Sequence, residues 1–290
     1  IDTTQRIEIA ELRAANSGAE AVNKVQSLTS EVEQVRSGLD QIKSVQQQIS
    51  STLEDVRTDT LWTRTKRINV RNLLGYQHFN RVLAAEDLDQ MVTTWGELLG
   101  LKLEKRELSY LGHHICQIED HCRGRLAADL ASVLLRGLVA RAAGSRGRLA
   151  VLEIGTLFGI GIAGVHEVVL PSVKSPKYTV IDPFEGYYKQ SAGDLLTGVP
   201  VSKGVFQDNM RRAGVPTRQI KILEGLSTEV SVLQELKDQK FDVVVIDGDH
   251  TYDGIKNDVE NYVGVLKDGG YLIVDDYGNE NWPDVQKYVD

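Results

Sequence analysis

Five acidic residues in the second half of the chain stand where short apolar segments end: Glu153, Asp182, Asp247, Asp275 and Asp276. These segments have the β-branched and aliphatic composition of buried strands. In an open parallel sheet the carboxyl ends of the strands lie along one edge, and ligands bind at that edge. Solubility alone does not explain why these acids stand at the strand ends, because acids elsewhere on the surface would serve that purpose equally well. The sequence therefore predicts a row of carboxylates beside a bound ligand.

A glycine-rich turn follows the first of these segments. Soon after the apolar run 149–152 come three glycines with the spacing Gly-x-x-x-Gly-x-Gly: Gly155, Gly159 and Gly161. A helical pattern over residues 162–169 comes next. A strand that runs into glycines and then a helix lets backbone N–H groups approach a ligand closely. The dinucleotide fingerprint is Gly-x-Gly-x-x-Gly, so this spacing counts against a nicotinamide dinucleotide. A tight turn without a ligand is the alternative interpretation.

The acids and glycines belong to a region in which predicted strands and helices alternate. Four further strand segments follow the first: residues 178–181, 220–223, 241–246 and 270–274. Helical segments separate them, for example residues 253–266. Alternating βα units with apolar strands predict an α/β fold with a doubly wound, mostly parallel, Rossmann-like sheet.

Residues 62–147 have a helical pattern with broad apolar faces and form a predicted linker or lid ahead of the sheet. Three helical segments are indicated: residues 73–82, 88–101 and 126–143. The stretch 109–119 gathers polar and titratable side chains shortly before the glycine turn and is a candidate lid over a ligand. Its histidines and His121 lack partners at a recognisable metal-ligand spacing, so surface positions are expected for them.

Residues 1–61 precede the first aromatic residue of the chain and read as a coiled-coil oligomerisation helix. From residue 20 a heptad repeat has nine apolar residues at ten core positions: Val25, Val32, Leu39, Gln46 and Leu53 at a, and Leu28, Val35, Ile42, Ile49 and Val56 at d. A sustained period of 3.5 residues predicts a left-handed coiled coil. Because β-branched residues occur at both a and d, we expect a homo-oligomer with more than two strands, a parallel trimer. The alternative is one amphipathic helix packed on its own domain.

The overall composition argues against several kinds of partner. A net charge of −8 gives no bias toward nucleic acid or an anionic membrane. No apolar run of the sequence is long enough for a membrane span, and its start does not resemble a signal peptide, so we expect neither feature. Two cysteines give no disulfide framework, so we expect a reducing compartment, the cytoplasm. Because the sequence opens on Ile1 rather than Met, we expect it to be a piece of a longer protein.

Taken together, these residues resemble a class I S-adenosylmethionine-dependent methyltransferase. The segment 153–161 is similar to the first motif of that family, and Asp182 follows the second strand, where the family places an acid on the ribose hydroxyls. Residues 245–254 (VIDGDHTYDG) and 274–277 (VDDY) are similar to the macrocin O-methyltransferase and cephalosporin-hydroxylase-like group. The resemblance covers roughly residues 105–290 and leaves out the coiled coil. We expect the methyltransferase domain at residues 148–290.

The resemblance implies a methyl donor, a metal and an acceptor. S-adenosylmethionine would be bound by residues of the glycine turn and the strand ends: Glu153, Gly155, Thr156, Gly159, Gly161, Asp182, Ser227 and Asp247. Three carboxylates would hold a divalent metal, Mg²⁺: Asp247, Asp275 and Asp276. Mg²⁺ prefers oxygen ligands and can lower the pKa of a bound hydroxyl. Asp249 or His250 would take the hydroxyl proton as general base. The implied acceptor is a sugar, a glycan or another small hydroxylated molecule.

One departure from the family concerns the end of the chain. The family's fold usually continues after the fifth strand with a helix and a strand hairpin, whereas this sequence stops at Asp290. We therefore expect the domain to be incomplete at its C-terminus. Two other classes of function stay open: a nicotinamide-dependent oxidoreductase, and a coiled-coil scaffold whose methyltransferase-like domain is inactive. The glycine spacing argues against the first, and the strand-end acids argue against the second.

Overall fold

The structure is a computed structural model of residues 1–290. It describes residues 18, 22–53, 56, 83, 85–144, 147–185, 193–194 and 197–290. The chain divides into two compact units, Ile1–Thr60 and Leu61–Asp290. None of the helices in the described part of the chain combines the length and the apolar character that a membrane span requires.

The N-terminal unit is helical over residues 22–53. At 1.5 Å per residue this helix is about 48 Å long. Its nine apolar core-position side chains are all exposed, from 51% at Leu28 to 64% at Val32, Ile42 and Leu53. These exposed side chains form the apolar stripe of an amphipathic helix.

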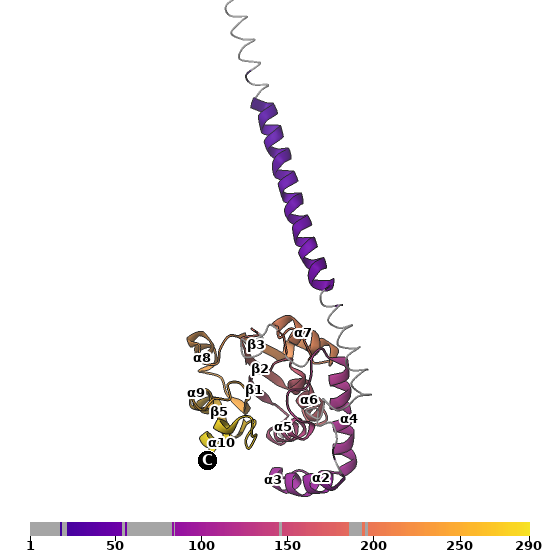
Figure 1. The fold of residues 1–290 in the computed structure, drawn as a ribbon, viewed down its shortest axis with the longest axis vertical. Coiled ribbons are helices and arrows are strands. Elements are labelled where there is room, and N and C mark those ends of the chain that lie inside the picture. Colours follow the sequence, from indigo (N-terminus) through magenta and orange to yellow (C-terminus); the bar gives the residue numbers. More distant parts are fainter. Residues whose placement is uncertain are drawn as a thin grey trace, which may run out of the picture. The chain divides into compact units, whose positions relative to one another are not determined.

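The C-terminal unit is built on five parallel strands in the spatial order β3-β2-β1-β4-β5, with helices on both faces (Figure 1). The strands are β1 (Ala150–Ile154), β2 (Lys177–Asp182), β3 (Ile220–Glu224), β4 (Phe241–Ile246) and β5 (Leu266–Val274). This confirms the predicted doubly wound α/β fold. The strand order reverses between β1 and β4, so a crevice opens there at the carboxyl ends of the strands.

Two hydrophobic cores cover the two faces of the sheet. Side chains alternate along each strand, so that Val151 belongs to one core and Leu152 to the other. The first core contains residues of α5 (Leu130–Ala143), α6 (Ile160–Val169) and α7 (Lys203–Arg212). The second contains residues of α8 (Val230–Leu236) and α9 (Tyr252–Tyr262). Because both faces are buried, the strands read as continuous apolar runs in the sequence.

Two strand boundaries differ from the sequence prediction. Glu153 lies inside β1, where it pairs with Val180 and Val245, rather than after the strand. β5 begins at Leu266 rather than at residue 270. The pairing of β4 with β5 shifts register between Phe241 and Val243. The start of β5 is polar, so its sequence predicts a turn rather than a strand.

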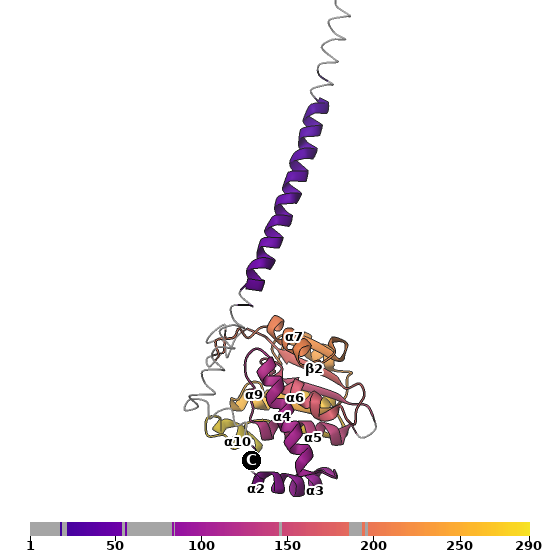
Figure 2. The ribbon, with the colours of Figure 1, turned by 90° about the vertical axis from the view of Figure 1, so that its right-hand side faces the viewer.

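The described helices before the sheet contribute side chains to the first hydrophobic core. The predicted helix 88–101 is three consecutive segments: α2 (Ala85–Gln90), the π-helical η2 (Met91–Trp95) and α3 (Gly96–Leu99). The candidate lid 109–119 lies in α4 (Lys105–His121), which crosses in front of α6 and α5 in Figure 2. Leu108 and Ile115 of α4 are fully buried, which fixes the helix as part of the core. The predicted helix 73–82 lies outside the described residues.

The remaining elements are short. Two 3₁₀ turns, η3 (Thr217–Gln219) and η4 (Val263–Val265), lead into β3 and β5. The last helix, α10 (Pro283–Val289), begins with a proline at its first position and packs against α9.

Candidate functional site

A cavity of about 480 Å³ lies at the carboxyl ends of the strands, over the point where the strand order reverses. Most of the predicted site residues line it: Glu153, Gly155, Thr156, Gly161, Asp182, Ser227, Asp247, Asp249, His250, Asp275 and Asp276. Gly159 is the one predicted residue that does not line it. A Cβ atom at Gly159 would lie 2.5 Å from Phe206, so this glycine allows α6 to pack closely on α7.

The glycine turn brings the end of β1 against the end of β4. Gly155 has a φ of +77°, and a Cβ atom there would overlap the carbonyl oxygen of Asp247. Only glycine fits this close approach of two backbones without strain. The turn therefore fixes the distance between β1 and the acid that follows β4.

Asp182 holds the other side of the turn. Its carboxylate accepts hydrogen bonds from the backbone N–H groups of Thr156 at 2.9 Å, Leu157 at 3.0 Å and Phe184 at 2.7 Å. Burial raises the pKa of Asp182, and these three bonds act against that shift. An ionised carboxylate has about four acceptor positions, so one of them stays available toward the cavity.

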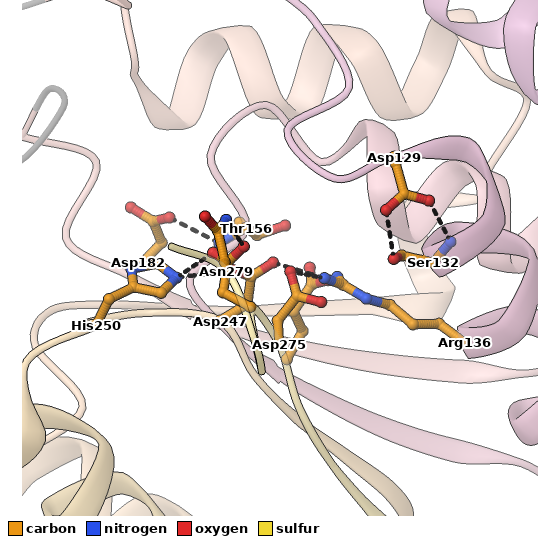
Figure 3. A network of polar contacts seen from close by, with 11 residues as sticks. Asp129, Ser132, Arg136, Thr156, Asp182, Asp247, His250, Asp275 and Asn279 are labelled. Atoms are coloured by element: carbon orange, nitrogen blue, oxygen red, sulfur yellow. Dashed lines mark hydrogen bonds and ion pairs between the residues drawn. The ribbon is translucent and has the colours of Figure 1, made fainter. Parts of the chain in front are cut away.

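Arg136, from the apolar helix α5, places a positive charge beneath the row of acids. Its Nη2 atom donates to Asp247 Oδ2 at 2.9 Å and to Asp275 Oδ2 at 2.5 Å, and its Nη1 atom lies 3.6 Å from Glu153 Oε1. Figure 3 shows the guanidinium beside the carboxylates of Asp247 and Asp275, with His250 on their other side. Sequence reasoning missed Arg136; its signal is a charged residue within a strongly apolar helix.

Burial and charge shift the pKa values of this group in opposite directions. Burial raises the pKa of Glu153 to about 7, although Arg136 opposes the shift. Burial likewise raises the pKa of Asp275 to about 6, again against the pull of Arg136. Burial alone would lower the pKa of Arg136, but the charges of its three carboxylate neighbours outweigh burial and raise it above its ordinary value.

His250 lies on the cavity side of the same acids. Its Nε2 atom is 2.8 Å from Asp276 Oδ2 and 3.5 Å from Asp247 Oδ1. Burial lowers the pKa of His250, but the two carboxylates outweigh burial and raise it to about 9. Asn279 donates to the second oxygen of Asp276 at 2.7 Å. The ring of Trp282, also missed from the sequence, stacks on the imidazole with centroids 4.7 Å apart.

The two neighbouring acids after β5 point in different directions. Asp275 faces Arg136, whereas Asp276, which has a φ of +58°, faces His250. Within the described residues, the group able to hold a metal ion is Asp247, His250 and Asp276, whose ligand atoms all lie within 4.8 Å of one another. The structure thus brings together two of the three predicted ligands and adds His250.

Asp249 and Ser227 occupy the rim of the cavity. Asp249 is exposed, and its Oδ1 atom accepts a hydrogen bond from the backbone of Thr251 at 3.0 Å, just ahead of α9. The carbonyl oxygen of Ser227 accepts a hydrogen bond from Tyr262 at 2.5 Å. Asp258, with 2% of its surface exposed, lies under this part of the rim, and burial raises its pKa to about 6.

Residues 152–277 match a family model described as a methyltransferase domain. The matched segment is just under half of the chain. It holds the glycine turn, the carboxyl ends of all five strands and every acid described above. The match favours methyl transfer over the nicotinamide-dependent alternative. No curated protein matches the chain.

Several solved structures are similar at low sequence identity. The O-methyltransferase TomG from Streptomyces achromogenes, bound to S-adenosylmethionine, is 16% identical, with 72% of this chain and 86% of that chain covered and a TM-score of 0.39. CalS11, a TDP-rhamnose 3′-O-methyltransferase, is 17% identical, with 72% and 86% covered and a TM-score of 0.42. An O-methyltransferase from Bacillus cereus is 16% identical, with 69% and 85% covered and a TM-score of 0.40. Likenesses of this extent carry no conclusion about the reaction.

Proposed function

We propose that this chain, whose residues 152–277 match a methyltransferase domain, is a class I S-adenosylmethionine-dependent methyltransferase that transfers the methyl group to a hydroxyl oxygen of a sugar or another small hydroxylated acceptor. The observation that carries the proposal is the group of His250, Asp247 and Asp276 in the cavity wall. A hydroxyl is a poor nucleophile at neutral pH. Its methylation therefore needs a base and nearby charges that remove its proton, and this group offers both.

The residues of the cavity fit the methyl donor. Glu153 is 4% exposed, and its Oε2 atom is buried without a hydrogen-bond partner in the described structure. A buried unpaired carboxylate oxygen is costly, and the ammonium group of S-adenosylmethionine would satisfy it. Asp182 keeps an acceptor position for a ribose hydroxyl. When bound, S-adenosylmethionine supplies a methyl group activated by its sulfonium.

The same cavity fits a divalent cation. Asp247 Oδ1 and Asp276 Oδ2 are the oxygen ligands that Mg²⁺ prefers, and His250 would act either as a third ligand or as the base. A cation held there would lower the pKa of an acceptor hydroxyl. Asp275 also lines the cavity, but its carboxylate pairs with Arg136, so we assign the metal-binding carboxylates to Asp247 and Asp276.

We assign to His250 the role of general base that accepts the proton of the acceptor hydroxyl. Its imidazole faces the cavity between two carboxylates, and Trp282 packs flat against it and restricts its rotation. In the proposed step the neutral form of His250, whose fraction grows as the pH rises toward its pKa of about 9, takes the hydroxyl proton. The acceptor oxygen would form its bond to the methyl carbon as the bond from that carbon to the sulfonium sulfur breaks, which leaves S-adenosylhomocysteine. Asp247 and Asp276 stabilise the imidazolium that results.

A screen with labelled S-adenosylmethionine tests the proposed function. We expect label to enter sugars or polysaccharide fragments at oxygen, because the proton-accepting group is built for a hydroxyl. Mass spectrometry of the products would locate the methyl group. Label found only on nitrogen or carbon nucleophiles would contradict the O-methyl assignment. Tight binding of S-adenosylhomocysteine without turnover of any acceptor would favour the inactive scaffold instead.

For the N-terminal unit we propose assembly through a parallel coiled coil, with a trimer favoured. The exposed stripe of nine apolar core positions supports this, because burying it requires other helices. Glu31 at a g position and Arg36 at the following e position would attract each other between neighbouring parallel helices in register. Gln46, the one polar core residue, would meet its own copies in that register, which disfavours shifted pairings.

Replacing Ile42 and Ile49 with Asp is expected to convert the oligomer to monomers, because charge at two d positions would be buried without a partner. Multi-angle light scattering would measure the change in mass. Gln41→Asp with Gln48→Asp is the matched control, since these residues precede the same two core positions but face outward in the repeat. A wild-type monomer at working concentration would end the proposal, as would equal dissociation of both double variants.

A further inference from the structure

Arg136 joins the ends of three adjacent strands with one guanidinium group. Glu153 belongs to β1, Asp247 follows β4 and Asp275 follows β5, and each has a carboxylate oxygen within 3.6 Å of a guanidinium nitrogen. Arg136 is 4% exposed, so these contacts are shielded from bulk water. A planar guanidinium with donors on three sides suits this role better than the single point charge of lysine.

The charges of the site divide into an inner and an outer layer. In the inner layer Arg136 faces Asp275 and the Oδ2 atom of Asp247. In the outer layer His250 faces Asp276 and the Oδ1 atom of Asp247. Asp247 thus spans both layers, and only its outer oxygen is turned toward the candidate metal position. Without the inner cation, the buried carboxylate of Glu153 and the partly buried carboxylates of Asp247 and Asp275 would repel one another.

We infer that Arg136 is a resident counter-cation that holds Asp247 and Asp275 in place, so that the cavity is fully formed before any divalent cation or methyl donor binds. It is a positioning residue that acts through Asp247. This inference depends on the proposed function at one point only, which is that the methyl donor binds in this cavity. A divalent cation then adds charge at the outer layer and is not needed for folding.

The test compares thermal unfolding in EDTA and in millimolar Mg²⁺ or Mn²⁺ for the wild type and Arg136→Met. The wild-type midpoint should change little. Arg136→Met should unfold at lower temperature in EDTA and recover by about 5–10 °C with the cation, because a metal can neutralise the acids that the guanidinium leaves behind. Calorimetry should also give a tighter Mg²⁺ affinity for the variant than for the wild type. Neither measurement needs methyl transfer, so the result is independent of the proposed reaction.

Arg141→Met is the matched control. Arg141 lies on the same helix and pairs with Glu107 of α4, away from the cavity. Its loss should lower stability without any dependence on the cation. Arg136→Lys should restore part of the stability in EDTA because it keeps the charge.

Should Arg136→Met fail to fold in either buffer, the double variant Arg136→Met with Asp275→Asn removes one acid together with the cation. It is expected to fold and to show the cation-dependent midpoint. A midpoint shift in these variants no larger than that of the wild type would overturn the inference, as would an equal shift in Arg141→Met.

Discussion

His250→Ala is expected to lower methyl-transfer turnover by about 10²- to 10⁴-fold, the range for loss of a general base. The imidazole is the titratable ring that faces the cavity between Asp247 and Asp276. Because His250 would act on the acceptor proton, the dissociation constant of S-adenosylhomocysteine should change far less than turnover. Single-turnover kinetics and calorimetry on the same preparation would separate the two effects.

Asp249→Asn is the internal control for this experiment. Asp249 is exposed and accepts a hydrogen bond from the backbone that begins α9, so its replacement should have a small effect. A large loss in Asp249→Asn with near-normal turnover in His250→Ala would reverse the assignment and make Asp249 the base. Equal small losses of turnover in both variants would show that neither Asp249 nor His250 is the general base.

Gly155→Ala is expected to damage both the fold and the binding of the methyl donor. The new Cβ atom would overlap the Asp247 carbonyl and lie 2.8 Å from the Cα atom of Gly248, so the ends of β1 and β4 would have to separate. The positive φ adds its own cost for any side chain. Together we expect a loss of about 2–4 kcal/mol of unfolding free energy. Binding of S-adenosylhomocysteine should weaken by at least about tenfold, since Asp247 moves with the strand.

Gly214→Ala separates the cost of the positive φ from the cost of the Cβ overlap with Asp247. Gly214 has a similar φ of +73°, but a Cβ atom there meets no atom within 4 Å. Its replacement carries the backbone penalty alone and should cost about 1–2 kcal/mol with no loss of binding. Chemical denaturation and calorimetry would measure both variants. Equal losses of stability would show that the Asp247 contact is unimportant.

The strands and the acids at their ends were predictable because both depend on local sequence. A buried parallel strand is apolar throughout, so segments such as 241–246 stand out, and the acid that follows each strand is fixed by the chain itself. The polar start of β5 was not predictable, because its pairing depends on a register shift against β4. His250 could be proposed from its distance of three residues from Asp247, within one motif.

The contacts of these acids were not predictable in the same way. Arg136 precedes Asp247 by 111 residues, and nothing local to either residue indicates that α5 carries its charge beneath β4. Asp276 has a left-handed backbone conformation, which is uncommon for residues other than glycine and has no signal in the local sequence. Trp282 reaches His250 only because the segment before α10 turns back over the cavity wall.

The position of α5 in the chain bears on how the protein can be cut into separately expressed pieces. The segment that matches the methyltransferase domain starts at residue 152, whereas Arg136 lies ahead of it on the helix Leu130–Ala143. A fragment that starts at the matched boundary would keep Glu153, Asp247 and Asp275 but lose the guanidinium that neutralises them. The segment that matches by sequence is therefore shorter than the segment that holds the site together, and an excised catalytic piece has to include α5.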